Sequence, residues 1–365
     1  LGLDLGISSL KVALFTAEGE LLAVESDEYM IYPEGDRVET DTAVYWEPMA
    51  AAIRRLLARW GGKPELIAAV AVSSHAETVI PMGADGKPSR PALVWMDNRS
   101  QPEADELTAT MGLQRVLEVS GQADIGPIWP VTKFRWLSKH EPDTVRRTAA
   151  FLLPEDYILF RLSGRFAGEH TLWSSSLVLD IRQRQLADEM IAFAGISKQQ
   201  IPPLYPSGTA IGQVSAACAA ETGLSPRTTV VTGAIDQVCA AIAAGNVLPG
   251  IVTESTGSVL ALVATVREPV FDLETRVPCH IHALPDTYCL LPWNTTGGLA
   301  LKWFKDRFAE DLIARAQASG EDVYNLLTTP AGDVPPGSDG LMMLPHLEGA
   351  FYPEYNTQAR AVFFG

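Results

Sequence analysis

The sequence predicts an α/β protein with two domains. The chain has 365 residues, of which 47% are hydrophobic and 20% charged, so it is long enough to bury two cores. Continuous apolar runs typical of buried strands alternate with amphipathic helical segments, which is the pattern of α/β folds. In addition, two short turns rich in glycine and hydroxyl side chains, at residues 4–9 and 254–258, lie far apart in the chain between strand-like segments. A similar turn in each part indicates two domains that act together.

The N-terminal part contains the clearest individual elements. Residues 1–25 predict a β-hairpin. Residues 47–60 predict a helix, because apolar side chains recur there at i, i+3, i+4 and i+7, with Pro48 in the first turn and Gly61 after the end. Residues 66–72 form a continuous apolar run and predict a buried strand that opens into a polar loop.

The rest of the chain divides near residue 245. Residues 101–164 predict mostly helix, and residues 228–233 predict another buried strand, followed by an alanine-rich helix. The second glycine and hydroxyl turn begins a new unit near residue 250. We therefore expect an N-terminal domain at 1–245 and a C-terminal domain at 246–365.

Charge and composition exclude several classes of partner. The formal net charge is −16 and the pI about 4.8, whereas nonspecific binding to nucleic acid or to an anionic membrane needs a basic surface. No apolar run approaches the roughly 20 residues that span a bilayer. The four cysteines form no C-x-x-C pair, and the first residue is not methionine, so we expect a few residues to precede it. We expect a cytoplasmic protein with reduced thiols that binds neither nucleic acid nor membrane.

The two glycine and hydroxyl turns predict the halves of a phosphate clamp. Glycine lets the backbone approach a bound anion closely, and exposed N–H groups and hydroxyls can donate hydrogen bonds to its oxygens. An ordinary Gly-Ser hairpin is the alternative for either turn taken alone. The candidate phosphate-binding residues are Ser8, Ser9 and Lys11 in the first turn and Thr256, Gly257 and Ser258 in the second.

Two aspartates stand out as candidates for chemistry. Asp236 follows a buried strand and precedes a helix, where α/β folds display functional side chains, and its carboxylate could accept a proton from an attacking hydroxyl. The alternative is a helix N-cap. Asp4 lies on an apolar strand beside the first turn, which favours a Mg²⁺ role through water, with an edge-exposed side chain as the alternative.

A polar loop after the strand at 66–72 is the candidate substrate site. Glu77 could accept hydrogen bonds from two neighbouring hydroxyls, and His75 could act likewise, although a histidine in a loop is more often a satisfied structural side chain. The sequence has no H-E-x-x-H zinc motif, no G-x-S-x-G elbow and no G-x-x-x-x-G-K-[ST] loop. If the two turns bind ATP, they must do so through a phosphate-binding architecture other than these.

Taken together, these segments resemble the FGGY family of carbohydrate kinases, within the superfamily of actin, sugar kinases and Hsp70 ATPases. Residues 90–99, R-P-A-L-V-W-M-D-N-R, resemble the family's R-P-A-I-x-W-x-D-x-R segment, which is the most specific match. The other matching segments follow in the family's order and are residues 4–9, 233–237, 254–258, 297–303 and 344–349, with Tyr352-Pro353.

The resemblance implies a two-domain actin-like ATPase (ribonuclease H-like) fold with a central cleft, and a second domain that is incomplete in this chain. It implies ATP-dependent phosphorylation of a sugar or polyol hydroxyl, with a ketopentose such as xylulose favoured and a polyol such as glycerol next. ATP and Mg²⁺ would take part, with Asp236 as general base. The residues implied near substrate are His75, Glu77, Trp129 and Gln237, and those implied near the nucleotide are Gly298 and Lys302.

Some residues depart from the family pattern, and other interpretations stay open. Ala76 occupies the place of the substrate-binding arginine of glycerol kinases, and the chain stops before a glycine-rich adenosine motif, which indicates either an incomplete sequence or altered adenine binding. A noncatalytic sugar- or nucleotide-binding protein on the same fold is the main alternative. An actin-like or chaperone-type ATPase is a third, and a homodimer is possible.

Overall fold

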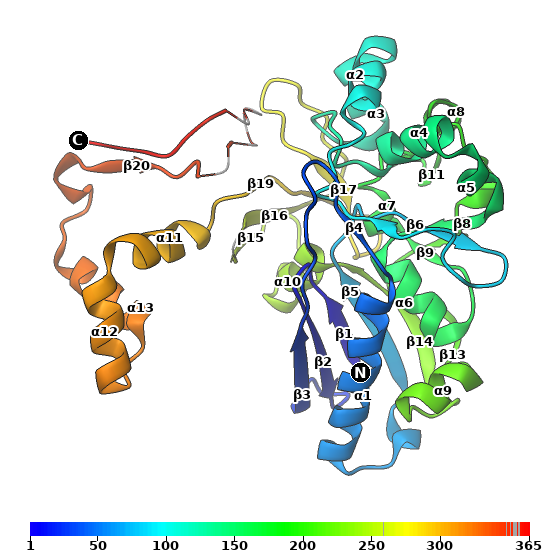
Figure 1. Ribbon diagram of the computed structural model, residues 1–365, viewed down its shortest axis with the longest axis horizontal. Helices are drawn as coiled ribbons and strands as arrows, with labels where there is room; N and C mark the ends of the chain where they lie inside the picture. Colours follow the sequence, from blue (N-terminus) through cyan, green and yellow to red (C-terminus); the bar gives the residue numbers. More distant parts are fainter. Residues whose placement is uncertain (258, 348, 351, 353–355, 357) are drawn as a thin grey trace.

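A six-stranded sheet forms the centre of the N-terminal part of the molecule (Figure 1). The computed structural model describes residues 1–257, 259–347, 349–350, 352, 356 and 358–365. The strands, in spatial order, are β13 (Ala210–Gln213), β14 (Thr229–Ile235), β5 (Ala69–Ser74), β1 (Gly2–Leu5), β2 (Ser9–Phe15) and β3 (Leu21–Glu28). β1, β5 and β14 run parallel, whereas β2, β3 and β13 pair antiparallel with their neighbours. The carboxyl ends of β1, β5 and β14 therefore meet at one edge of the sheet.

The predicted hairpin of residues 1–25 is present as a meander of three strands. β1 turns into β2 through Gly6, whose N–H donates to the Ser9 carbonyl at 2.9 Å. β2 turns into β3 through residues 16–20, where Gly19 has a φ of 92°, a conformation that glycine adopts without strain. The first glycine and hydroxyl turn thus joins two central strands of the sheet.

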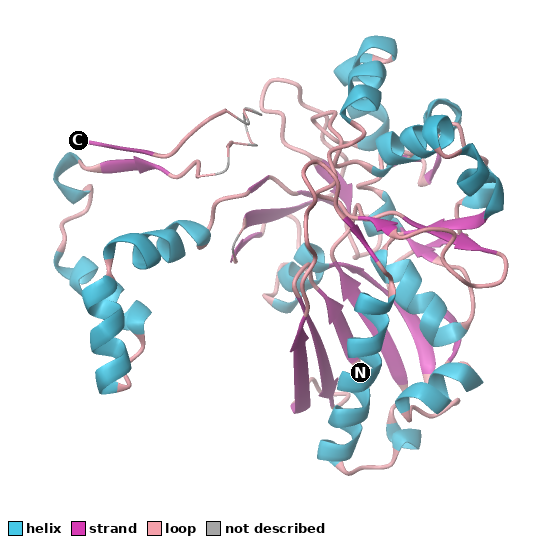
Figure 2. Ribbon diagram, viewed as in Figure 1, coloured by secondary structure: helices cyan, strands magenta, loops and turns pink. Residues whose placement is uncertain are grey.

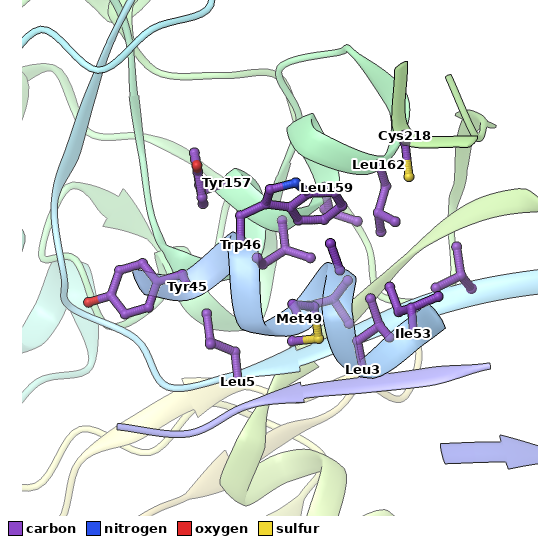
Figure 3. Packing of buried hydrophobic residues seen from close by; sticks show 14 of the residues in the cluster. Leu3, Leu5, Tyr45, Trp46, Met49, Ile53, Tyr157, Leu159, Leu162 and Cys218 are labelled. Carbon is purple, nitrogen blue, oxygen red and sulfur yellow. The ribbon is translucent and has the colours of Figure 1, made fainter. Parts of the chain in front are cut away.

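Helix α1 (Ala43–Trp60) packs against one face of this sheet (Figure 3). Met49 and Ile53 of the helix lie in one buried cluster with Leu3 and Leu5 of β1. Alternate residues of β1 and β2 are buried, as expected for central strands whose two faces differ. This cluster fixes the position of β1, and with it the position of the strand end that carries the first turn.

Helix α1 begins four residues before its predicted start, so Pro48 lies inside the helix. A proline inside a helix removes one backbone hydrogen bond and costs about 3 kcal/mol. The extra turn buries Tyr45 and Trp46, and each large side chain taken out of water contributes roughly 1.5–3 kcal/mol, so packing outweighs the proline. The helix ends at Gly61, with φ 70°, as predicted.

Most of the helices lie between β5 and β14 in the chain, which confirms the helical prediction for 101–164. They are α2 (Gln101–Thr110), α3 (Gly112–Ser120), α4 (Pro130–His140), α5 (Pro142–Arg147), α6 (Pro154–Ser163), α7 (His170–Trp173), α8 (Asp188–Ala194) and α9 (Ala216–Thr222). Short strands connect them: β6 (Ile80–Gly83) pairs with β8 (Thr148–Leu152), β4 (Glu39–Thr40) with β7 (Ala92–Leu93), β9 (Gly168–Glu169) with β12 (Leu204–Tyr205), and β10 (Leu179–Asp180) with β11 (Gln185–Leu186). Much of this part packs around a second buried cluster that includes Trp129, Phe134 and Trp173.

A second, smaller sheet follows helix α10 (Asp236–Ala243). Its strands are β15 (Val252–Thr256), β16 (Leu260–Val266), β18 (Tyr288–Leu290) and β17 (Cys279–Ile281) in spatial order, and β19 (Trp293–Asn294) also pairs with β16. Helix α10 contacts β14 and β5 of the first sheet and β15 and β16 of the second, so it lies between the two sheets. The second glycine and hydroxyl turn joins β15 to β16.

The C-terminal segment extends away from both sheets (Figure 2). It contains α11 (Leu299–Phe308), α12 (Glu310–Ser319), α13 (Val323–Thr328) and the pair β20 (Met342–Leu344) and β21 (Val362–Phe364). The segment 297–303, which matches the family pattern, leads into helix α11 and forms its first residues. Within the described residues, no helix combines the length and the apolar character that a bilayer crossing requires.

Candidate active site

The candidate site lies at the edge where β1, β5 and β14 end. Asp4 of β1 is opposite Ser73 of β5, and Ala234 of β14 is opposite the same serine on its other side. The Ser73 hydroxyl donates to Oδ1 of Asp4 at 3.0 Å. Asp236 follows β14 directly, so the fold brings together the two aspartates that the sequence singled out.

Asp236 is the first residue of α10, one position after the end of β14. The strand was predicted to end at 233 with the helix a few residues later, whereas the strand runs to Ile235 and the helix starts at once. Oδ1 of Asp236 accepts the N–H of Gln237 at 2.7 Å. Ile235 is the N-cap residue of α10, so Asp236 is not the predicted N-cap. It lies in the first turn of the helix, where its carboxylate accepts the N–H of Gln237.

The pKa of Asp236 is raised to about 7: burial is the main cause, the negative charge of Asp4 adds to it, and the N–H of Gln237 acts in the opposite direction. The usual value for aspartate is near 3.9. A carboxylate with a pKa near neutrality is suited to accept a proton at neutral pH and to release it afterwards. The electrostatics therefore support a general base at this position.

Glu77 lies in the loop after β5 and faces the same group of acids. Burial raises the pKa of Glu77 to about 7; the Ser175 hydroxyl lowers it, Asp236 raises it and Lys133 lowers it. Its φ of 60° is unusual for a residue with a side chain, and a left-handed conformation of this kind is held only where the surroundings enforce it. The loop therefore holds this carboxyl close to Asp236 at some conformational cost.

Lys133 is a buried member of this site that sequence reasoning missed. It lies on α4, is fully buried, and its ammonium donates to the carbonyls of Pro127 and Ile128 and, at 3.4 Å, to that of Trp95. Burial lowers the pKa of Lys133 to about 7, and the charges of Asp97 and Glu77 oppose this effect. A lysine in an amphipathic helix is ordinarily expected at the surface, so its spacing gave no signal.

The ring nitrogens of His75 and Trp129 already have hydrogen-bond partners within the protein. The Nδ1 atom of His75 lies 3.0 Å from the Leu5 carbonyl and its Nε2 lies 3.3 Å from the Thr78 hydroxyl. Burial lowers the pKa of His75 to about 4, so the ring is neutral at pH 7. The indole N–H of Trp129 donates to Asp124 at 3.2 Å. Contact of these two residues with substrate stays a prediction.

Gln237 differs from His75 and Trp129, because one of its side-chain polar atoms has no hydrogen-bond partner among the described residues. Among the described residues, its Oε1 is buried and accepts no hydrogen bond. The same is true of side-chain oxygens in three consecutive residues that precede α11 and that sequence reasoning did not select: Asn294, Thr295 and Thr296. A buried polar atom without a partner is costly; a ligand hydroxyl could donate to the two amide oxygens, and the two threonine hydroxyls could donate to a ligand oxygen.

The first turn presents donors at the end of the central strands. The Tyr29 hydroxyl donates to the carbonyl of Gly6 and so fixes the turn from behind. Ser8 and Lys11 are exposed and Ser9 is partly exposed. These side chains can meet a ligand at the surface of the turn.

The second turn contacts the start of α11. The N–H of Gly298 donates to the Gly257 carbonyl at 2.7 Å, and the Thr256 hydroxyl donates to Glu254. A Cβ added at Gly298 would lie 2.7 Å from the Gly257 carbonyl oxygen, so this close approach requires glycine. Lys302, one turn along α11, forms an ion pair with Asp306. Ser258, the remaining predicted residue of this turn, lies outside the described residues.

The donor set fits Mg²⁺ and a polyphosphate. Asp4 is partly exposed and supplies a carboxylate oxygen, which is the ligand type that Mg²⁺ prefers, usually with several waters retained. Among the described residues no cluster of three or more histidine, cysteine, aspartate or glutamate side chains could hold a metal ion directly. A single carboxylate beside N–H and hydroxyl donors suits a hydrated ion carried with phosphates better than a protein-enclosed metal.

The arrangement of the first sheet, with the smaller sheet packed on α10, defines an actin-like ATPase fold. The gluconate kinase of Lactobacillus acidophilus has this fold: its solved structure matches 100% of this chain over 71% of its own length, with a TM-score of 0.88 and 22% identity. A model of the N-terminal domain of the FGGY family of carbohydrate kinases matches residues 1–243, and the chain belongs to this family. The fold class and the family inferred from the sequence are both confirmed.

Curated relatives agree with this assignment. The gluconokinase of Bacillus subtilis is 28% identical over 368 residues, and the xylulose kinase of the same organism is 26% identical over 366 residues. Each alignment covers 100% of this chain and 71% of the relative. The chain is thus a carbohydrate kinase, a phosphotransferase with an alcohol group as acceptor.

Proposed function

We propose that the protein transfers the γ-phosphoryl group of ATP to a hydroxyl of a small sugar or polyol, with Asp236 as general base. The observation that carries this proposal is the position of Asp236: it lies at the strand edge beside Asp4 and Glu77, with a pKa raised to about 7. The family of the chain supports phosphoryl transfer to an alcohol, and the site supplies a residue able to take the proton.

The proposed reaction needs one proton transfer and one phosphoryl transfer. The acceptor hydroxyl attacks the γ-phosphorus; its O–P bond forms as the bond to the β–γ bridging oxygen breaks, and ADP leaves. The hydroxyl proton passes to the Asp236 carboxylate. General-base help of this kind typically contributes about 10²–10⁴-fold to the rate. Positioning of the acceptor by neighbouring side chains supplies much of the remainder.

Glu77 and Gln237 are proposed to bind the acceptor. A carboxylate accepts hydrogen bonds from two adjacent hydroxyls, and the unpartnered Oε1 of Gln237 can accept another. His75 and Trp129 would complete the pocket wall. Since Glu77 and Asp236 are both acidic, these side chains favour a neutral polyhydroxyl compound over a sugar acid. A ketopentose such as xylulose is our first choice and a polyol such as glycerol the second.

The two turns are proposed to bind the phosphates of ATP. Ser8, Ser9 and Lys11 would do so from the first domain, and Thr256, Gly257, Ser258, Gly298 and Lys302 from the second. Mg²⁺ would be held by Asp4 through water, and when bound it would neutralise charge on the transferring phosphoryl group. The exposed donors of the first turn and the Gly257–Gly298 contact support this assignment.

The proposal also includes the domain boundary, the cellular location and the oligomeric state. We place the domain boundary between residues 245 and 246, in the connection between α10 and β15. A cytoplasmic location and a possible homodimer complete the proposal. A noncatalytic binding protein on the same fold is the alternative that the sequence leaves open, and membership of a family of carbohydrate kinases favours the enzyme over it.

A coupled assay of ATP consumption by the full-length protein tests the proposal. With a panel of ketoses, polyols and aldonates, ADP should form only in the presence of an acceptor. Asp236→Asn should lower kcat at least 100-fold while calorimetry shows unchanged ATP binding, since only the base is removed. Sugar binding without turnover across the panel would favour the noncatalytic protein, and an unchanged kcat in Asp236→Asn would remove Asp236 from its role.

A further inference from the structure

Strand β14 reaches Asp236 through an irregular stretch. It pairs with β5 in regular register up to Val231 opposite Ala71, and resumes with Ala234 opposite Ser73. Two residues of β14, Thr232 and Gly233, therefore lie opposite one residue of β5, which is a β-bulge. A bulge takes backbone N–H groups out of the ladder, and buried N–H groups need other acceptors.

Glu155 supplies one of these acceptors. This residue lies in the first turn of α6, is fully buried, and its Oε1 accepts the N–H of Gly233 at 2.7 Å. Gly233 itself is packed so closely that an added Cβ would lie 1.7 Å from the Val72 carbonyl oxygen. The bulge is thus fixed on one side by the backbone of β5 and on the other by a carboxyl group.

Glu169 supplies the second acceptor through an intermediate hydroxyl. The N–H of Ile235 donates to the Thr171 hydroxyl at 2.8 Å, and that hydroxyl donates to Oε2 of Glu169 at 2.5 Å. Oε2 also accepts the N–H groups of Thr171 and Leu172, while Oε1 accepts the Ser207 hydroxyl at 2.7 Å. Ile235 is the residue before Asp236, so this chain of hydrogen bonds ends at the start of α10.

The two carboxyl groups are buried together without a cation. Both are fully buried, and burial raises the pKa of each; the charges of Glu169 and of the neighbouring Asp156 also raise that of Glu155, and no cation counters either charge among the described residues. Two such groups do not both ionise, because each charge raises the cost of the other. Glu169 receives four hydrogen bonds and is the better stabilised anion. Oε2 of Glu155 has no partner among the described residues, so Glu155 is the member that retains a proton.

We propose that Glu155 and Glu169 form a carboxylic acid–carboxylate pair that positions Asp236, because Glu155 holds the N–H of Gly233 within the bulge and Glu169, through Thr171, holds the N–H of Ile235 just after it. The pair does not touch substrate. It determines where β14 ends and α10 begins, and hence where the Asp236 carboxylate lies. This inference rests on the proposed role of Asp236.

If this proposal is right, replacement by glutamine should have different effects on kcat at position 155 and at position 169. Glu155→Gln keeps an acceptor for Gly233 and replaces the protonated oxygen by an NH₂ group, so kcat should stay within about threefold of the wild-type value. Glu155→Ala removes the acceptor, and kcat should fall at least tenfold with KM for the sugar nearly unchanged. Glu169→Gln places an NH₂ group where a carboxylate oxygen accepts N–H or O–H donors, so kcat should again fall at least tenfold.

Hydrogen exchange of residues 229–243 in the full-length protein gives a readout that does not depend on turnover. Protection should decrease in Glu155→Ala and Glu169→Gln and be retained in Glu155→Gln. Asp156→Asn is the matched control, since the neighbouring buried Asp156 accepts hydrogen bonds from Leu153 and Trp173 instead of β14. It should leave exchange of this segment unchanged.

The kinetic and exchange results of these variants either support the proposal or overturn it. If Glu155→Ala does not fold, the comparison of the two glutamine variants remains, and equal effects at 155 and 169 would overturn the inference. Wild-type kcat and exchange in Glu155→Ala would also overturn it. Failure of the proposed function is recognised separately, because either the wild-type protein would turn over no acceptor or Asp236→Asn would retain turnover, whatever the exchange pattern shows.

Discussion

The contact between the second turn and α11 gives a prediction that depends on geometry alone. Gly298→Ala introduces a Cβ 2.7 Å from the Gly257 carbonyl oxygen, whereas ordinary van der Waals contact begins at 3.4 Å, so the turn and the helix must separate by about 0.7 Å. Gly298 has φ −59° and ψ −18°, which alanine adopts freely, so the backbone itself is not strained. The substitution therefore acts only by displacing the turn.

The displacement should reduce the use of ATP. A misplacement of 1 Å can reduce a rate by roughly 100-fold, so a shift of this size should lower kcat/KM for ATP by about 10- to 100-fold. The same shift lengthens the 2.7 Å hydrogen bond from Gly298 to Gly257. The value of KM for the sugar should change little, because none of the proposed acceptor residues belongs to the second turn or to α11.

Steady-state kinetics with varied ATP and a fixed, saturating acceptor measure the effect. Gly332→Ala is the matched control, because an added Cβ there meets no atom within 4 Å and its kinetics should equal those of the wild type. If Gly298→Ala retained wild-type kcat/KM for ATP while remaining folded, the second turn and α11 would not form part of the nucleotide site.

Three further predictions follow from the charges of the site. Because the pKa of Asp236 is raised from 3.8 to about 7 and the base must be ionised, kcat should rise about tenfold from pH 6 to pH 8; a flat profile would contradict the shift. Lys133→Met should raise KM for the sugar several-fold. Because the buried carbonyls of Pro127 and Ile128 would lose their donor, it should also lower the free energy of unfolding by about 1–3 kcal/mol, which denaturant titration would measure. Neutral ketoses should be turned over with a kcat/KM at least tenfold above that of gluconate, and Glu77→Gln should narrow the difference; preference for gluconate would contradict an acidic acceptor pocket.

The parts of the site that the sequence predicted are those whose signal is local. Asp236 was found because an apolar run ends there and an alanine-rich helix follows. The first turn was found from the order of glycine and hydroxyl residues between strand-like segments. In both cases neighbours in sequence supply the structural reason, so the pattern can be recognised without knowledge of distant contacts.

The missed features depend on residues far apart in the chain. Pro48 indicated a helix start, yet burial of Tyr45 and Trp46 extends α1 before it. Lys133 was not singled out in the sequence because its hydrogen-bond acceptors are loop carbonyls, which no side-chain pattern reveals. Tertiary contacts of this kind override local propensity.

The bulge in β14 explains why a proposed catalytic residue can be recognised in the sequence more easily than the residues that support it. The side chain of Asp236 is chemically distinct and lies in a recognisable motif, whereas Gly233 and Ile235 are held through backbone N–H groups that every residue but proline possesses. The acceptors come from Glu155, 78 positions before Gly233, and from Thr171, 64 positions before Ile235. In the sequence, Glu155 stands in the first turn of a helix, where an acidic residue is ordinary. Only the fold shows that this carboxyl is buried and accepts a hydrogen bond from the bulge, and we expect glutamine to be the milder replacement because it keeps that acceptor whereas alanine removes it.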